Sequence, residues 1–357
     1  MHSFNPDEVR ILYSPNTRRF AQRVKEHLSN KLDHSVRGGL GIYPIEMQYF
    51  NSREYKPKAM ESVREKKTYV IHDFSDQEGN YEPNHGYIKL FLIGDALRRA
   101  SPQKTTFILP HMGYQRQDRL DEERVPISFK AMMDAFVATT QPMPTGLVTF
   151  DMHAGQEQGF SNLPTDNLYA SPLFAEYIKK DDSVEKCVVV SPDVGGATRA
   201  RGLAKRIGTE IAICDKRRES AGKAEIMHVV GNVKGKKCKI VDDVIDTSRT
   251  ALKSYTALLD NGAEDVEIYS THAICSRDLA DPEWVPESEF KKIGVKVKTT
   301  DTIPRKPEYY QDNRDWMTVL SVAPMVASAI FEIQTGGSVS KIFKPDAQYV
   351  SELLRIL

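Results

Sequence analysis

Short apolar runs alternate along the chain with amphipathic stretches that have helical spacing. Because apolar strands separated by helices are typical of parallel sheets covered by helices, this alternation predicts an α/β protein. Helical spacing is clearest at residues 20–28 and 87–99. The strands are expected at residues 9–13, 68–72, 106–109, 146–150, 187–190, 210–213, 239–241 and 266–269.

The C-terminal part of the chain is less regular. The segment 276–314 is polar and rich in proline, although 295–297 has the composition of a strand. The run 317–330 is apolar with helical character, and we expect it to return the chain to a core. The final segment, 349–357, is amphipathic with a single apolar face, which favours packing on a neighbouring element over packing on lipid.

The length of 357 residues is large for one hydrophobic core. A prior of roughly 100–200 residues per domain suggests two domains. We expect successive α/β domains at 1–168 and 169–319, with the segment from about 320 to 357 a candidate to pack back on the first. No fixed-period repeat indicates a solenoid.

Charge and cysteine usage narrow the class of protein. Lys plus Arg and Asp plus Glu both number 49, so no net charge recruits nucleic acid or an anionic membrane, and neither is expected as a partner. No apolar run approaches the ~18 residues of a membrane span, and the first residues lack a signal pattern, which predicts a cytoplasmic protein. Reduced, buried cysteines are expected at positions 187, 214, 238 and 275.

The segment 240–250, Ile-Val-Asp-Asp-Val-Ile-Asp-Thr-Ser-Arg-Thr, has the most distinctive chemistry. It joins an apolar strand to a helix that ends near Asn261-Gly262, and the start of a helix favours an anion. Carboxylates suit Mg²⁺ or sugar hydroxyls, and side-chain hydroxyls suit phosphate oxygens. An ordinary strand end followed by a helix cap would use the same residue types, so both interpretations stay open. The candidates are Asp242, Asp243, Asp246, Thr247, Ser248 and Thr250.

Two further segments place polar groups after apolar strands. Asp193 precedes Gly195-Gly196, where the absence of side chains lets a ligand approach the backbone. His153 follows the strand 146–150, and ligand sites in open α/β sheets gather at such carboxyl ends. The alternatives are an ordinary turn before a helix for Asp193 and a surface or satisfied core histidine for His153.

Two basic segments are also candidates. The run Lys216-Arg217-Arg218-Glu219 is either a solvated strand exit or a cationic clamp on polyphosphate, with a mobile flap after it. The loop 114–119 contains Arg116, Gln117 and Asp118 and is otherwise an ordinary surface loop of ion pairs. Neither a P-loop motif nor a Gly-x-Gly-x-x-Gly after a strand occurs, which disfavours a P-loop ATPase and a dinucleotide-binding Rossmann domain.

The order of these segments is more informative than any one of them. The loops at 114, 151, 191, 216 and 240, at these spacings, resemble those of the phosphoribosyl-diphosphate (PRPP) synthases, also called ribose-phosphate diphosphokinases. The segment 240–250 by itself resembles the PRPP loop that these synthases share with phosphoribosyltransferases. The resemblance runs from about residue 10 to 343 and is densest between 114 and 275.

The resemblance implies a fold, a reaction and an assembly. The fold would be two tandem phosphoribosyltransferase-like α/β domains, each a mainly parallel sheet flanked by helices. The reaction would transfer a diphosphoryl group from MgATP to ribose 5-phosphate, giving PRPP and AMP for nucleotide biosynthesis. The ATP site would be shared between subunits of a homo-oligomer based on dimers, with a hexamer as one option.

The resemblance also implies roles for individual residues. Lys216 and Arg218 would close over the transferring phosphates, and His153 and Asp193 would position Mg²⁺. ATP would contact Phe50, Ser52, Arg53, Glu54, Arg116, Gln117, Asp118 and His153. Ribose 5-phosphate would contact Arg218, Asp242, Asp243, Asp246, Thr247, Ser248, Arg249 and Thr250.

The chain departs from the family pattern in two segments. These are 240–250, called here the ribose loop, and 50–54, called here the adenine loop. Ser248-Arg249 stands where the synthases usually have two small residues, often Gly-Gly, so the backbone has less freedom and an extra cation lies near the phosphate. With a basic residue at position 249, the loop resembles that of some phosphoribosyltransferases instead. The adenine loop, 50–54, also differs from the usual pattern, and Gly155 replaces a serine of many regulated members.

Two other functions remain as alternatives. A phosphoribosyltransferase that consumes PRPP would explain the ribose loop, but not the histidine loop, the basic clamp and two full domains. A non-catalytic regulatory subunit would explain the whole length, but such proteins tend to lose parts of the clamp or of the metal site, which are intact here.

Overall fold

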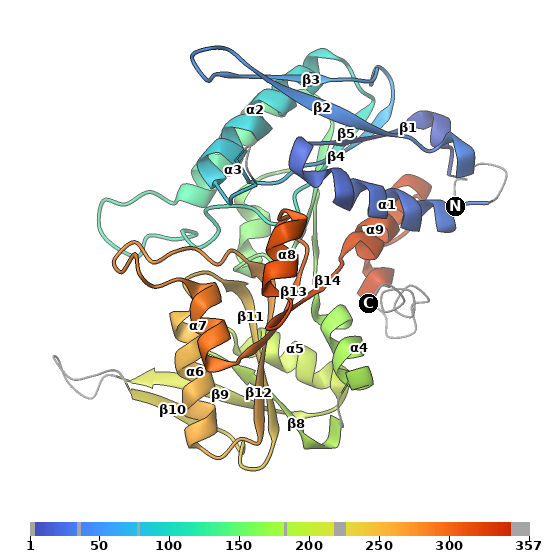
Figure 1. Ribbon diagram of the computed structural model, residues 1–357. Coiled ribbons are helices and arrows are strands. Elements are labelled where there is room, and N and C mark those ends of the chain that lie inside the picture. The colour runs from blue at the N-terminus through green and yellow to red at the C-terminus, as the bar shows by residue number, and fades with distance from the viewer. Residues whose placement is uncertain (1–3, 34–36, 77–78, 182–183, 218–225, 344–357) are drawn as a thin grey trace. The chain divides into compact units, whose positions relative to one another are not determined.

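The computed structural model describes residues 4–33, 37–76, 79–181, 184–217 and 226–343. These residues form two compact units, each built on a seven-stranded, mainly parallel sheet with helices against it (Figure 1). Within the described ranges, the first unit comprises 4–169, 302–305 and 322–343, and the second comprises 170–301 and 306–321. The predicted α/β class with two tandem sheets is confirmed.

The first sheet has the strand order β3-β2-β1-β4-β5-β6-β7. Neighbouring strands are parallel except for the antiparallel pair β2 and β3 at one edge. Its strands are β1 (Val9–Tyr13), β2 (Ile42–Tyr49), β3 (Tyr55–Ala59), β4 (Lys67–Ile71), β5 (Lys104–Ile108), β6 (Thr145–Phe150) and β7 (Thr165–Leu168).

Helices α1 (Arg18–Asn30), α2 (Pro83–Arg99), α3 (Ser128–Thr140) and α9 (Ala323–Thr335) belong to the first unit. Side chains from α2 and α3, including Tyr87 and Phe129, form one core with sheet residues such as Phe107. Helix α9 packs against α1, and the hydroxyl of Tyr69 in β4 donates a hydrogen bond of 3.2 Å to Gln334 in α9. The chain therefore returns to the first unit after it has built the second.

The second sheet repeats the strand order of the first, as β10-β9-β8-β11-β12-β13-β14, again with one antiparallel edge pair. Its strands are β8 (Cys187–Ser191), β9 (Glu210–Arg217), β10 (Ile226–Val230), β11 (Lys237–Ile245), β12 (Asp265–Ala273), β13 (Lys296–Thr300) and β14 (Met317–Leu320). Its helices are α4 (Ser171–Asp181), α5 (Ala197–Ile207), α6 (Arg249–Asp260), α7 (Pro286–Ile293) and α8 (Pro307–Asn313).

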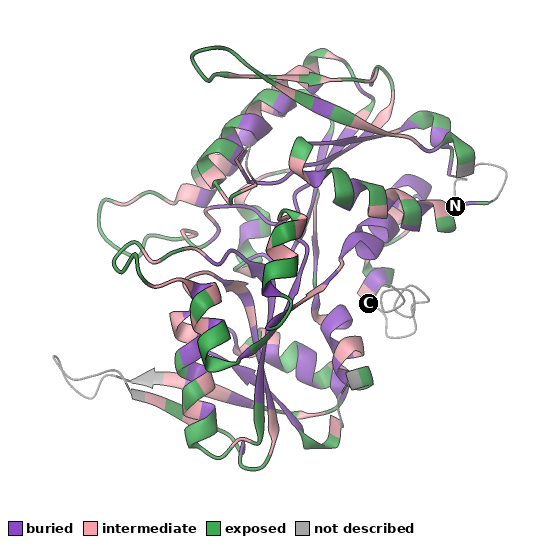
Figure 2. Ribbon diagram, in the orientation of Figure 1, coloured by how far each residue is buried: buried purple, intermediate pink, exposed green. Residues whose placement is uncertain are grey.

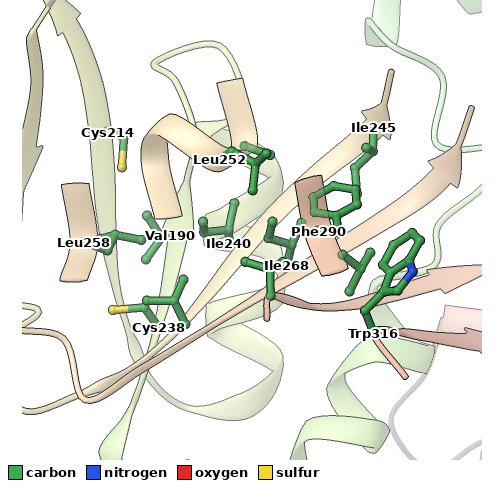
Figure 3. Close-up of a cluster of buried hydrophobic side chains, with 14 of the residues drawn as sticks. Val190, Cys214, Cys238, Ile240, Ile245, Leu252, Leu258, Ile268, Phe290 and Trp316 are labelled. Carbon is green, nitrogen blue, oxygen red and sulfur yellow. The ribbon is translucent and has the colours of Figure 1, made fainter. Parts of the chain in front are cut away.

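One buried cluster joins α6 and α7 to the second sheet. Leu252 and Leu258 of α6 and Phe290 of α7 point toward the apolar side chains of the central strands, Val190, Ile240 and Ile268 (Figure 3). All six side chains are buried, and the central strands are purple along most of their length in Figure 2. Packing of this kind fixes the start of α6, and with it the loop that follows β11.

Two predicted elements have different bounds in the structure. The run 317–330 is not one helix, because Met317–Leu320 forms the edge strand β14 and α9 begins only at Ala323. Pro324 lies in the first turn of α9, where its missing N–H leaves no helical hydrogen bond unmade, whereas it could not continue a helix from residues 317–320. The strand expected at 239–241 continues as β11 to Ile245, because its ladder with β12 persists to the pair Ile245 and Ala273. Asp242 and Asp243 therefore lie in the strand.

The four cysteines are buried and free, as predicted. No helix in the described ranges is long and apolar enough to cross a membrane. The amphipathic segment predicted at 349–357 lies outside the described residues.

Candidate active site

The turn after β8 holds Asp193 at the start of α5. The Oδ1 atom of Asp193 accepts a hydrogen bond of 2.8 Å from the backbone N–H of Gly196, and the hydroxyl of Ser191 donates to the Asp193 carbonyl at 2.7 Å. A side chain at Gly196 would meet the Ser191 Oγ at 2.7 Å, so glycine is needed there. The Asp193 side chain is exposed, which leaves its carboxylate accessible to a cation.

The paired carboxylates of β11 lie beside an arginine of α5. The Nη1 atom of Arg199 is 3.2 Å from Asp243 Oδ1 and 3.5 Å from Asp242 Oδ1. Burial, followed by the charge of Asp243, raises the pKa of Asp242 well above its usual range. One guanidinium thus faces two carboxylates, and the excess negative charge suits a cation or a donor of hydrogen bonds such as a sugar hydroxyl.

The ribose loop ends in an unusual backbone conformation. Ser248 has φ 65° and ψ −10°, in the left-handed region that favours glycine. Its carbonyl accepts the N–H of Leu252 at 2.9 Å, so α6 starts at once after it. Its hydroxyl donates to the carbonyl of Thr247 at 2.5 Å. The first N–H groups of α6 are therefore presented together with Thr247 and Thr250, as an anion site at a helix start requires.

The side chain of Arg249 is engaged by acidic partners. Its Nε donates to Asp278 at 2.5 Å, and its Nη2 donates to Asp281 at 2.8 Å. The guanidinium also lies over the ring of Trp284, with its central carbon 4.1 Å from the ring centroid. The extra cation predicted beside the phosphate is thus neutralised by two carboxylates in this structure.

The basic clamp is only partly described. The strand β9 extends to Arg217, so the backbone of Lys216 lies in a ladder opposite Met227 of β10. The predicted strand exit therefore comes later than residue 213. Arg218 lies outside the described residues.

The predicted adenine loop, 50–54, closes the hairpin between β2 and β3. The backbone N–H of Phe50 donates to the Glu54 carbonyl at 3.1 Å, and that of Arg53 donates to the Phe50 carbonyl at 2.8 Å. Ser52 is hydrogen-bonded to the Glu54 carboxylate. The ring of Phe50 is 55% exposed and lies below the Lys56 ammonium. Single exposed apolar side chains are common on protein surfaces, and this one is accessible to a ligand or another chain.

The two other predicted ATP loops of the first unit contact each other. The amide of Gln156 donates to the Asp118 carboxylate at 3.0 Å, which joins the loop that holds Arg116 and Gln117 to the loop that holds His153. Gln117 is also fixed within its loop by a 2.9 Å hydrogen bond to Asp121. The His153 and Arg116 side chains are exposed. These loops therefore form one polar surface at the carboxyl ends of β5 and β6.

Three contacts of the predicted site residues escape sequence reasoning. Sequence patterns assign no role to the three residues that make them. Arg199 contacts Asp242 and Asp243. Gln156 contacts Asp118, and Trp284 contacts Arg249. One signal was available for Arg199, because it lies in the first turn of the helix that follows a strand adjacent to β11. No local pattern signals the other two.

Comparison with known proteins tests the resemblance. Residues 9–139 match the family model described as the N-terminal domain of ribose phosphate pyrophosphokinase, and residues 169–311 match the phosphoribosyl transferase domain. A ribose-phosphate pyrophosphokinase of Cereibacter sphaeroides is 39% identical over 316 residues, covering 87% of this chain and 89% of the relative. One from Caldanaerobacter subterraneus subsp. tengcongensis is 36% identical over 337 residues, covering 94% and 98%.

A solved structure agrees with these matches. The crystal structure of phosphoribosylpyrophosphate synthetase from Mycobacterium smegmatis has a TM-score of 0.76 and 28% sequence identity, and it covers 92% of this chain and 100% of that one. Both family models and the coverage of the relatives point to one family. The chain belongs to the ribose-phosphate pyrophosphokinase family of enzymes.

Proposed function

We propose that this chain transfers the β,γ-diphosphoryl group of MgATP to the C1 hydroxyl of ribose 5-phosphate, which gives PRPP and AMP. Ribose-phosphate pyrophosphokinase names the same activity as PRPP synthase. The observation that supports this proposal most is the ribose loop: paired carboxylates at the end of β11 precede a helix start on α6, within a chain that has both domains of the family.

The acceptor side of the reaction is assigned to the second unit. Asp242, Asp243 and Asp246 accept hydrogen bonds from the ribose hydroxyls, and the 5-phosphate binds the hydroxyls and N–H groups between Thr247 and Thr250. The partial neutralisation of Asp242 and Asp243 by Arg199 leaves acceptors for the sugar. Arg218 contributes a further contact to ribose 5-phosphate.

The donor side is assigned to loops of the first unit. Arg116, Gln117, Asp118 and His153 contact ATP, together with the exposed hairpin tip 50–54 of a neighbouring subunit. Phe50 supplies a ring for the base, and Ser52, Arg53 and Glu54 supply polar contacts. A homo-oligomer based on dimers would follow from this sharing.

Mg²⁺ is assigned to His153 and Asp193. In the described ranges, no three or more His, Cys, Asp or Glu residues form a group that could hold a metal ion. Mg²⁺ does not require such a group, because it is usually held by one or two carboxylates together with substrate phosphates and water. The exposed Asp193 carboxylate supplies an oxygen of the required kind. When bound, the ion would offset the negative charge of the phosphates.

The transfer is a single displacement at the β-phosphorus. The C1 hydroxyl oxygen bonds to the β-phosphorus, the bond from that phosphorus to the oxygen it shares with the α-phosphate breaks, and the hydroxyl proton passes to solvent. AMP leaves with the bridging oxygen. Lys216 and Arg218 stabilise the charge on the transferring oxygens, so alignment and electrostatics account for most of the rate.

The direct test incubates the purified chain with ATP, Mg²⁺ and ribose 5-phosphate. We expect AMP and PRPP in equal amounts, and no AMP when ribose 5-phosphate is omitted. A phosphoribosyltransferase would consume added PRPP when given a base and would release no AMP from ATP. A regulatory subunit would make neither product by itself. Either result would overturn the proposal.

A further inference from the structure

Trp284 connects the ribose loop to the segment that follows β12. Its indole Nε1 donates a hydrogen bond of 2.8 Å to the carbonyl oxygen of Thr247. Its ring faces the guanidinium of Arg249 at 4.1 Å. One side chain therefore contacts the loop on both sides of Ser248, through the backbone of the residue before it and the side chain of the residue after it.

These contacts hold Ser248 in the left-handed backbone conformation, which is unfavourable for a residue other than glycine. The carbonyl of Thr247 belongs to the peptide plane that sets φ of Ser248, and the hydrogen bond from Trp284 holds this plane. The hydrogen bond from Leu252 N–H to the Ser248 carbonyl holds the next plane. With both planes held, Ser248 remains at φ 65°, although a residue with a Cβ atom adopts this region reluctantly.

Arg249 completes the connection. Asp278 and Asp281 accept from two different nitrogens on the edge of its guanidinium plane, at 2.5 and 2.8 Å, while one face of that plane lies against the ring of Trp284. The Arg249 side chain is 37% exposed and that of Asp278 is 18% exposed, so the inner ion pair is partly shielded from solvent. Planar, two-point pairing of this kind restrains arginine more than a single contact does.

We propose that Trp284 and Arg249 are positioning residues that hold the ribose loop in its phosphate-binding conformation, where two glycines would adopt it unaided. The inference rests on the proposed function, because the phosphate is that of ribose 5-phosphate. The Arg249 side chain acts through Asp278, Asp281 and Trp284, and its backbone N–H remains part of the anion site at the start of α6.

The rival role for Arg249 is a direct charge contact with the phosphate, and the two roles predict opposite effects for one variant. Asp278→Asn removes one of the two carboxylates that engage the guanidinium. If Arg249 binds phosphate directly, its release should lower the KM for ribose 5-phosphate. If it positions the loop, the same change should raise that KM. Glu283→Gln is the matched control, because it removes an exposed carboxylate from the same segment that makes no ion pair with any described residue.

Trp284→Phe tests the hydrogen bond to Thr247 while a ring remains over Arg249. We expect the KM and the calorimetric Kd for ribose 5-phosphate to rise about tenfold, the equivalent of about 1.4 kcal/mol, since one hydrogen bond to the loop is lost. The KM for ATP should stay within about twofold of the parent, because the proposed ATP contacts lie in other loops. A purely structural role would lower the melting temperature and would not change one KM selectively.

Rescue by glycine is the decisive measurement. Ser248→Gly removes the need for a restraint, so in that background Trp284→Phe should raise the KM for ribose 5-phosphate by less than about threefold. An equal effect in both backgrounds, or a lower KM in Asp278→Asn, would overturn the inference. If the parent makes no PRPP, the proposed function fails instead. If Trp284→Phe does not fold, the sign of the Asp278→Asn effect decides between the two roles.

Discussion

Asp73 and Asp242 occupy equivalent positions in the two units. Strands β1 and β8 are equivalent in the two sheets, and a Ser-Pro sequence follows Tyr13 in the first and Val190 in the second. In the neighbouring parallel strand, Tyr13 pairs with Ile71 and Val190 pairs with Ile240. Each aspartate lies two residues after that partner. The two sheets therefore share both the strand order and the position of one carboxylate, but the surroundings of the two carboxylates differ.

The two aspartates should respond oppositely to neutralisation. Asp73 is 5% exposed and accepts hydrogen bonds from Ser14 at 2.9 Å and from Asn16 at 3.4 Å. Asp73→Asn replaces one acceptor oxygen with a donor and should lower the free energy of unfolding by about 1–3 kcal/mol. Asp242→Asn removes repulsion from Asp243 and should raise that free energy at pH 7. Denaturant titration of both variants at pH 7 measures the two effects, and a change of the same sign in both would contradict the electrostatic difference.

The Asp242 effect should also depend on pH. Because the folded-state pKa of Asp242 is raised above 3.8, the folded protein binds more protons than the unfolded chain above that pH. The contribution of Asp242 to stability therefore falls as pH rises from about 3.8 through the folded-state pKa. We expect the stability advantage of Asp242→Asn to grow over this range and to vanish at lower pH. Melting curves from pH 4 to pH 8 check the trend, and an advantage that shrinks as pH rises would refute it.

Lys239, Glu267 and Lys298 form a buried ion cluster on the face of the second sheet opposite helices α6 and α7. This cluster should be essential for stability. Lys239 is 0% exposed, and its Nζ lies 2.8 Å from Glu267, which also accepts from Tyr269 at 2.9 Å and faces Lys298 at 3.4 Å. Burial raises the pKa of Glu267, but the hydrogen bond and charge of Lys239, with the charge of Lys298, lower it overall. Its stabilising contribution is therefore present above pH 4.5 and is lost as pH falls through the folded-state value.

The matched comparison uses an exposed pair of the same length. Lys236 and Glu210 are also 2.8 Å apart, but the Glu210 side chain is 74% exposed. Glu267→Gln leaves a buried lysine without its counter-ion and should cost about 3–5 kcal/mol at pH 7, whereas Glu210→Gln should cost less than about 1 kcal/mol. Equal losses of unfolding free energy in the two variants would show that burial does not control this cluster.

The parts of the site that sequence could predict are local. The segment 240–250 contains its strand, its carboxylates and its helix start within eleven consecutive residues, so pattern and chemistry coincide. The contacts that escaped prediction are distant along the chain: Arg249 and Asp281 are 32 residues apart, and Gln156 and Asp118 are 38 apart. Only tertiary packing brings such pairs together, and no spacing rule reports it.

Edge strands are hard to predict for a different reason. Strand β3 reads Tyr-Lys-Pro-Lys-Ala, and its side chains alternate between exposed and partly buried. A strand at an edge needs little apolar surface, and charged residues or proline there protect the unpaired edge. Apolar runs therefore predict the central strands β1, β4, β6 and β8 well. They do not predict the edge strands β3 and β10, or β2, which lies beside β3 and is also largely exposed.

The proposed role of Lys216 predicts a kinetic effect. Lys216→Ala should lower kcat at least about 10²-fold, equivalent to about 2.7 kcal/mol of transition-state stabilisation. The control is Lys205→Ala on α5, which removes an exposed lysine of the same unit and should leave kcat unchanged. Steady-state assays at saturating ATP and ribose 5-phosphate measure both. Near-normal turnover of Lys216→Ala would remove this lysine from the proposed mechanism.

The proposed sharing of the ATP site between subunits predicts that two variants of low activity restore activity when mixed. Phe50→Ala should raise the KM for ATP, because the exposed hairpin ring no longer contacts the base, and Lys216→Ala should abolish turnover in its own subunit. In a mixed dimer, one site combines both defects and the other combines an intact hairpin with an intact clamp. Random mixing gives half mixed dimers, so about one quarter of all sites should be active at an ATP concentration where Phe50→Ala alone is slow.

The measurement is AMP formation after the two variants are dissociated and reassociated at equal concentration. Activity no greater than the mean of the separate variants would mean that each hairpin serves its own subunit.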